Sequence, residues 1–158
     1  MKLRFLCANH REWLCSQPEQ ALHMCADSFE TGWHHCQSLQ WREALAHMGC
    51  AFECAEILMT SRGVAPRIAL DWFLKTLDGL LRILEKLRLV DNCVELYQIA
   101  IGRLRQEAKG SISPQMEADL YMHITRLNRD RRCLDTDRQS LPLMPAGDDA
   151  RRADTVLH

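Results

Sequence analysis

Cysteine and histidine side chains are concentrated in the first part of the chain, where they could form a metal or redox site. The stretch WREALAHMGCAFECAEIL, residues 41–58, places Cys50 and Cys54 one helical turn apart, with His47 three residues before the first cysteine. Metal ligands share this spacing with small side chains that face a neighbouring helix. The spacing alone therefore leaves both interpretations open.

A second group of ligand types lies at the N-terminus. Cys7, His10 and Cys15 supply one C-x-x-H half-site and a further thiol. Structural zinc takes four closely spaced ligands, commonly from two such knuckles, and the sequence offers no second knuckle. Additional ligands would have to come from His34, His35 or Cys36. This set defines our alternative hypothesis, a Cys/His-based metal or redox sensor on a helical bundle.

The two cysteines of residues 41–58 are better explained as core residues. A reactive thiol needs exposed, electropositive surroundings, whereas Glu53 and Glu56 place negative charge beside Cys54. Cysteines at i and i+4 of one helix seldom form a disulfide without distorting it, and a free cysteine packs as a small hydrophobic residue. We therefore expect no cofactor at Cys50 and Cys54.

The rest of the sequence gives no sign of catalysis, of nucleic-acid binding or of a membrane anchor. It contains no glycine-rich phosphate loop, G-x-S-x-G or H-E-x-x-H motif. The net charge of −1 does not call for a nucleic acid, and no apolar run approaches the roughly 20 residues that span a bilayer. The N-terminus lacks the pattern of a signal peptide, so the eight cysteines are expected to be reduced thiols in a cytoplasmic protein. Because the catalytic motifs are missing, we expect that protein to be non-enzymatic.

The elements that must position these residues are all predicted to be helices, because apolar residues recur every three or four positions and strand patterns are absent. A short helix near residue 9 should lie in an N-terminal segment, residues 1–15. Ser16 and Glu19 form a capping box ahead of a first long helix. Further helices are expected at 41–62, from Pro66, from about Asp91 to Gly110, and from Pro114 to about residue 131. The predicted domain thus covers 16–131, and 132–158 is predicted to be a flexible tail.

Small side chains indicate how these helices pair. Gly32 lies within the first long helix, Trp41 begins the second, and Ala44, Met48 and Ala51 follow at steps of three, four and three. This pattern resembles a tetratricopeptide repeat, a helix-turn-helix unit of roughly 34 residues with small residues where its helices cross. In this register the first copy covers residues 25–58.

A second, degenerate copy covers residues 74–107. The three-four-three spacing recurs at Val90, Cys93, Tyr97 and Ala100, but Leu81 occupies the position where a small residue is expected. The resemblance implies an all-α array of about five helices, stacked as antiparallel hairpins with a C-terminal capping helix. Two hairpins and a cap are few for such an array, and a homodimer formed through an end face would extend it.

The resemblance also implies a groove lined by the first helix of each hairpin. Carried over by register, its partner-binding residues are Phe29, Trp33 and Cys36 from the first hairpin, and Lys75, Asp78, Arg82 and Lys86 from the second. An aromatic anchor beside a basic row suits a peptide with acidic groups or a free carboxylate. The alternative is that Trp33 is a core residue and the charged row is only a solvated helix face.

The sequence therefore predicts a non-enzymatic adaptor or chaperone that binds another protein or peptide. Small bacterial chaperones of type III secretion are built from a few such repeats, and they provide an analogy at the level of the fold.

Overall fold

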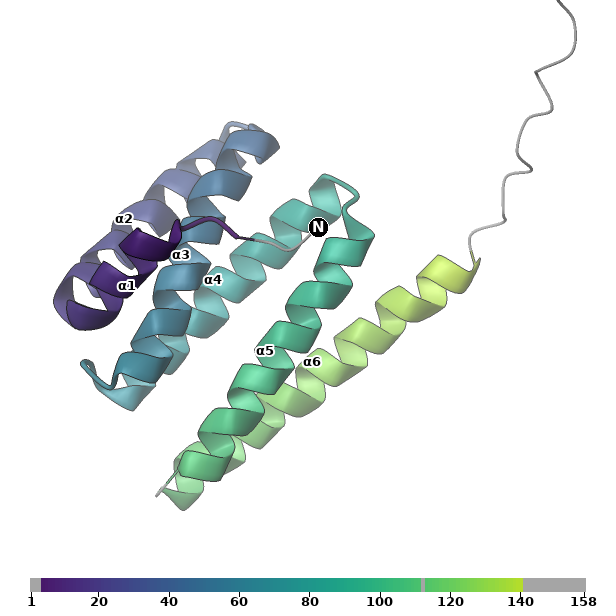
Figure 1. Ribbon diagram of the computed structural model, residues 1–158. Coiled ribbons are helices and arrows are strands. Elements are labelled where there is room, and N and C mark those ends of the chain that lie inside the picture. The colour runs from purple at the N-terminus through teal and green to yellow at the C-terminus, as the bar shows by residue number, and fades with distance from the viewer. Residues whose placement is uncertain (1–3, 112, 141–158) are drawn as a thin grey trace, which may run out of the picture.

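The computed structural model describes residues 4–111 and 113–140, and the side chains up to residue 136. Within these ranges every regular element is a helix, which confirms the predicted all-α class (Figure 1). The six helices are α1 (Ala8–Ser16), α2 (Pro18–Gln37), α3 (Trp41–Ser61), α4 (Pro66–Lys86), α5 (Val90–Gly110) and α6 (Pro114–Ser140).

Proline and left-handed residues set most of the helix boundaries. Pro18 and Pro66 stand in the first turns of α2 and α4, where a missing N–H costs nothing. The left-handed residue after α3 is Arg62, with φ 55°, so the helix ends one residue before the predicted position 62. The predicted capping box is also wrong: Gln17 is the N-cap of α2, and the Ser16 hydroxyl donates instead to the Trp13 carbonyl within α1.

The last helix is longer than the sequence pattern indicates. We expected it to end near Arg131, but α6 continues to Ser140, so the start of the expected tail is helical. The segment 132–140 contains no proline or glycine that would stop a helix, and Leu134 still packs against the core. The remainder of the predicted tail, 141–158, lies outside the described residues.

The first three long helices form the most closely packed part of the structure. α3 packs along both α2 and α4, and α2 and α4 also touch each other. Met48 of α3 is fully buried between two glycines, Gly32 of α2 and Gly79 of α4. A Cβ at Gly32 would lie 3.1 Å from the Met48 backbone nitrogen, and one at Gly79 would lie 2.9 Å from its sulfur. The two glycines therefore permit the close approach of all three helices.

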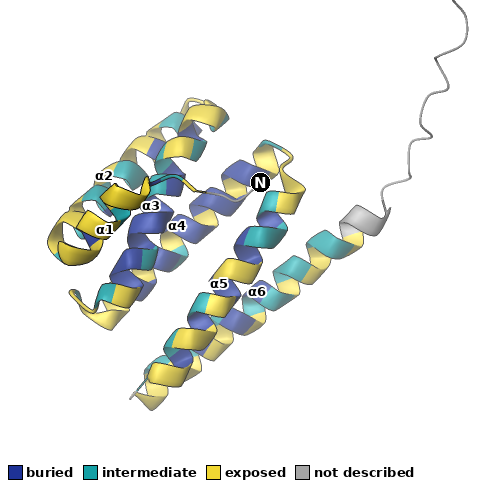
Figure 2. Cartoon of the chain, viewed as in Figure 1, coloured by how far each residue is buried: buried dark blue, intermediate teal, exposed yellow. Residues whose placement is uncertain are grey.

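The second part of the structure is more open. α5 and α6 form an antiparallel pair, whereas α4 and α5 diverge from their shared turn and touch much less than α2 and α3 do (Figure 1). Leu81 occupies the position where the first hairpin has Gly32, and the small residue of α4, Gly79, faces Met48 of α3. Buried residues nevertheless continue from α3 and α4 onto α5 and α6 (Figure 2).

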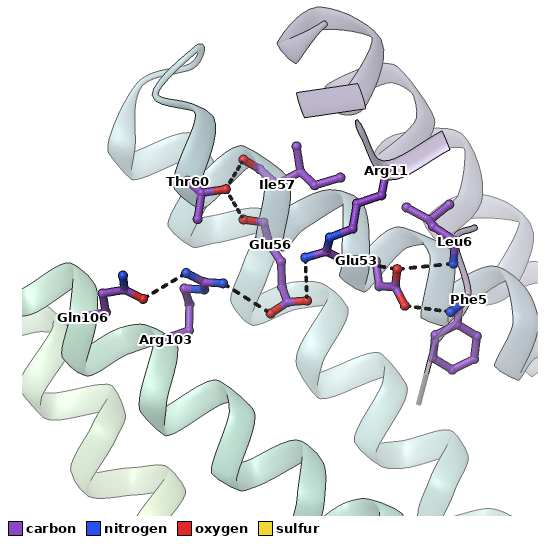
Figure 3. Close-up of polar contacts among 9 residues, drawn as sticks. All are labelled: Phe5, Leu6, Arg11, Glu53, Glu56, Ile57, Thr60, Arg103 and Gln106. Atoms are coloured by element: carbon purple, nitrogen blue, oxygen red, sulfur yellow. Dashed lines mark hydrogen bonds and ion pairs between the residues drawn. The ribbon is translucent and has the colours of Figure 1, made fainter. Parts of the chain in front are cut away.

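A buried carboxylate fixes the N-terminal segment to this scaffold. Glu53 of α3 is only 5% exposed, and its two oxygens accept the backbone N–H groups of Phe5 at 2.6 Å and Leu6 at 3.2 Å (Figure 3). The Arg11 guanidinium donates to the same carboxylate at 3.3 Å. Because each acceptor oxygen has a donor, the buried charge is satisfied and α1 is held against α3.

Glu56, one turn further along α3, extends this network to α5. Its carboxylate lies 3.7 Å from Arg11 and 3.8 Å from Arg103 (Figure 3). Burial raises the pKa of Glu56, and the two guanidinium groups only partly oppose that rise. The same face of α3 thus connects the first helix of the chain with the fifth.

Candidate peptide-binding groove

Five of the seven predicted partner-binding residues line one pocket between α2 and α4. The pocket has a volume of about 510 Å³ and is bounded by Phe29, Trp33, Lys75, Asp78, Gly79 and Arg82. Residues on each helix are spaced three or four apart, so they share the face that turns toward the neighbouring helix. The close approach of α2 and α4 to α3 brings the two faces together. We call this pocket the α2–α4 groove.

Aromatic rings form one wall of the α2–α4 groove. Phe29 and Trp33 of α2 are stacked, with ring centroids 6.3 Å apart and planes 6° apart. Trp72 of α4 meets Phe29 edge-on at 5.9 Å and 74°. Trp33 retains 39% exposure, so it is not a core residue. The wall therefore presents aromatic surface to solvent, where it could bury against a partner.

The Lys75 ammonium group is held against this aromatic wall. Its nitrogen lies 4.4 Å from the Phe29 ring centroid and 4.8 Å from that of Trp72. Two cation–π contacts of this kind each stabilise an exposed site by about 0.5–1 kcal/mol. Lys75 thus keeps a positive charge at the groove and also orders the rings beneath it.

The other two charged residues of the groove differ in their pairing. Asp78 is bound by Arg126 of α6 at 3.2 Å, so its charge is already matched. Arg82 is exposed and has no carboxylate partner within the part of the chain that the structure describes. With Asp78 neutralised, Lys75 and Arg82 make the groove electropositive. An acidic group is the ligand type that would complete this arrangement.

Two predicted residues lie away from the groove. Cys36 is 7% exposed and belongs to the core, where burial raises the pKa of its thiol. Lys86 is exposed in the last turn of α4, beyond the residues that line the groove. At the C-terminal end of α4 its positive charge interacts favourably with the helix dipole, which is a structural role.

Sequence reasoning missed Trp72 and Gly79. Both continue the spacing of the charged row on α4, which runs Trp72, Lys75, Gly79, Arg82. Extending that row by one turn toward the N-terminus would have found the tryptophan. The position of Gly79 also lies on this row, but its close contact with Met48 of α3 could not be found from the row.

The residues of the alternative metal site do not gather. Cys7, His10 and Cys15 are all exposed, on or just before α1. Across residues 4–111 and 113–140, no three or more His, Cys, Asp or Glu side chains are grouped so that they could hold a metal ion. Cys50 is half-buried, and burial raises the pKa of the Cys54 thiol to about 12, so that thiol is not ionised near neutral pH.

Comparisons with protein families, curated proteins and solved structures give no match to this chain. The α2–α4 groove is therefore the main structural basis for a function. As a separate finding, none of the helices in the described parts of the chain has both the length and the apolar composition required to cross a bilayer.

Proposed function

We propose that this chain is a non-enzymatic adaptor or chaperone that binds a peptide segment of another protein in the α2–α4 groove. The observation that carries the proposal is the exposed aromatic wall beside Arg82, which has no carboxylate partner among the described residues. Trp33 and Phe29 offer surface for an apolar side chain, and Arg82 offers a planar donor pair for a carboxylate.

The chemistry of the groove defines the peptide. Lys75 is already placed over Phe29 and Trp72, so Arg82 is the cation most available to a ligand. Tryptophan and arginine are also the residue types that most often dominate binding energy at protein interfaces. The preferred peptide therefore carries an aromatic or large aliphatic residue and, one or two turns away, an aspartate, a glutamate or a free C-terminal carboxylate.

We also propose how the helices pair, where the protein is located and how it assembles. In the tetratricopeptide-like register, α2 and α4 are the first helices of the two hairpins and α6 is the terminal cap. A cytoplasmic location agrees with the eight free thiols. Exposed Tyr121 and Met122 on α6 favour this end face as the surface for a homodimer. A bacterial secretion chaperone is the specific analogy within this class.

Selection from a random peptide library tests the proposal without knowledge of the natural partner. We expect wild-type protein to enrich peptides with an apolar anchor and an acidic group. Trp33→Ala should lower the affinity for the selected peptides by at least 10-fold, because removal of a central anchor costs about 1.4 kcal/mol or more of binding free energy. Arg82→Glu should remove the preference for acidic residues, since it reverses the unpaired charge.

Matched controls come from elsewhere on the surface. Trp13 of α1 is 48% exposed and lies outside the groove, so Trp13→Ala should leave peptide affinity unchanged. Lys109→Glu, at an exposed position of α5, controls for the charge reversal. Equal affinity for wild type, Trp33→Ala and Arg82→Glu would refute the groove. Stoichiometric zinc in purified protein, lost in Cys7→Ser, would instead support the metal-sensor hypothesis.

A further inference from the structure

A second cavity lies where α4 and α5 have moved furthest apart. In Figure 1, α4 and α5 diverge from their shared turn into a V, with the α3–α4 turn at one tip of its open end and the C-terminal end of α5 at the other. Between them is a cavity of about 390 Å³. Its apolar lining comes from three helices, with Leu58 and Met59 of α3, Ala69 and Leu70 of α4, and Met116 and Leu120 of α6.

Charges at the edge of this cavity are paired with one another. Arg62 binds Glu107 of α5 at 3.2 Å, and Arg67 binds Asp119 of α6 at 2.6 Å. Each basic group beside the cavity thus has an acidic partner on a helix across it. An anionic ligand would compete with Glu107 and Asp119 for these guanidinium groups, whereas an uncharged ligand would leave both pairs intact.

The size of the cavity limits what it can contain. An engineered apolar cavity of about 150 Å³ stays dry and binds benzene, and the cavity here, at about 390 Å³, is more than twice as large. It falls within the range of small-molecule pockets and is too small to receive a helix. Met59 and Met116 can adjust their side chains to the shape of a ligand, because methionine is unbranched and flexible.

From these features we propose that the α3–α6 cavity binds an uncharged hydrophobic small molecule, of the size of two or three fused rings or a medium-length alkyl chain. The ligand lies between Met59 and Met116 and bridges the two helical parts that α4 and α5 leave apart. The proposal is independent of the peptide groove, because α2 contributes no residue to this cavity.

Titration with N-phenyl-1-naphthylamine, an uncharged fluorescent probe, tests the proposal. We expect saturable fluorescence enhancement with one site per chain. Ala69→Phe places a ring in the cavity and should weaken probe binding by at least 10-fold, and Val64→Trp does so from the α3–α4 turn. Ala118→Phe is the matched control, because Ala118 is exposed on α6 and should leave probe binding unchanged.

A measurement on the wild-type protein covers the case in which a variant does not fold. With ¹³C-methyl methionine, addition of the probe should shift the signals of Met59 and Met116 and leave that of Met48, buried between α2 and α4, in place. Non-saturable fluorescence, unshifted Met59 and Met116, or undiminished binding by folded Ala69→Phe would overturn the proposal. Tighter binding of the anionic 8-anilinonaphthalene-1-sulfonate than of the neutral probe would overturn the assignment of an uncharged ligand.

Discussion

Replacement of the buried carboxylate of Glu53 should release the N-terminal segment from the rest of the protein. In Glu53→Gln, one oxygen remains and can still accept the Phe5 N–H. The other oxygen, which accepts from the Leu6 N–H and from Arg11 in the wild type, becomes an NH₂ group that cannot accept a hydrogen bond. The variant therefore loses two hydrogen bonds to a charged acceptor and sets donors against donors.

The expected loss follows from these contacts. A hydrogen bond to a charged group contributes about 1.5–3 kcal/mol, but residues 4–16 can detach locally and so limit the total. We expect the segment to lose about 2–3 kcal/mol of local stability, which corresponds to a roughly 30- to 150-fold faster exchange of its protected amides. The free energy of global unfolding should change less, because α3 makes most of its contacts with α2 and α4 rather than with α1.

Native-state hydrogen exchange at the Phe5 and Leu6 amides measures this effect directly, and urea denaturation gives the global value. Glu30→Gln is the matched control, since Glu30 is an exposed glutamate in the interior of α2 rather than in the first turn of a helix. Its amide exchange and its urea midpoint should equal those of wild type. If Glu53→Gln leaves the exchange of both amides unchanged, the carboxylate does not hold the segment and our reasoning fails.

Three further predictions concern stability and thiol reactivity. Burial raises the pKa of Glu56 above 4.5, so between pH 4.5 and the raised value the folded state keeps a proton that the unfolded state has released. Wild-type stability should therefore fall as pH rises through this window. Glu56→Gln has no such titration, so its stability relative to wild type, measured by urea denaturation, should rise across the same window. Gly102→Ala should stabilise the protein by up to about 1 kcal/mol, because no described atom outside its own helical turn lies within 4 Å of the added Cβ. Gly49→Ala should destabilise the protein, because its Cβ would meet the Phe5 ring, and thermal melts compare the two variants. Burial raises the pKa of Cys25 to about 12, so a thiol reagent at pH 8 should label it only after unfolding, and early labelling found by mass spectrometry would contradict its buried position.

Local chemistry made most helix boundaries predictable. Pro66 and Pro114 cannot lie in the middle of a helix and mark the starts of α4 and α6 correctly, and Trp41 begins α3 where the apolar pattern placed it. The end of α6 was less predictable, because residues 132–140 show no sustained apolar pattern even though no residue among them breaks a helix.

Features that depend on distant parts of the chain were not predictable in the same way. Glu53 appeared in the sequence as a charge beside Cys54, yet its carboxylate is occupied by amides from residues nearly fifty positions away. Gly79 of α4 faces Met48 of α3, and α4 and α5 touch only a little; neither contact pattern is visible in the spacing of residues on a single helix. The row of residues that lines the α2–α4 groove could be identified because it lies on single helix faces, but its cation–π contacts depend on how two helices meet.

Met48 lies between Gly32 and Gly79, and Gly79 lines the α2–α4 groove, so a flexible side chain supports the groove from α3. The Met48 thioether lies against Gly79 of α4 and the Met48 backbone lies against Gly32 of α2, so one residue of α3 contacts both helices that carry the groove. Since methionine has three rotatable side-chain bonds, its tip can yield beneath Gly79 at little energetic cost, while the contact with the backbone at Gly32 stays rigid. A groove with one rigid and one compliant side would tolerate anchors of different bulk and would discriminate among them by charge.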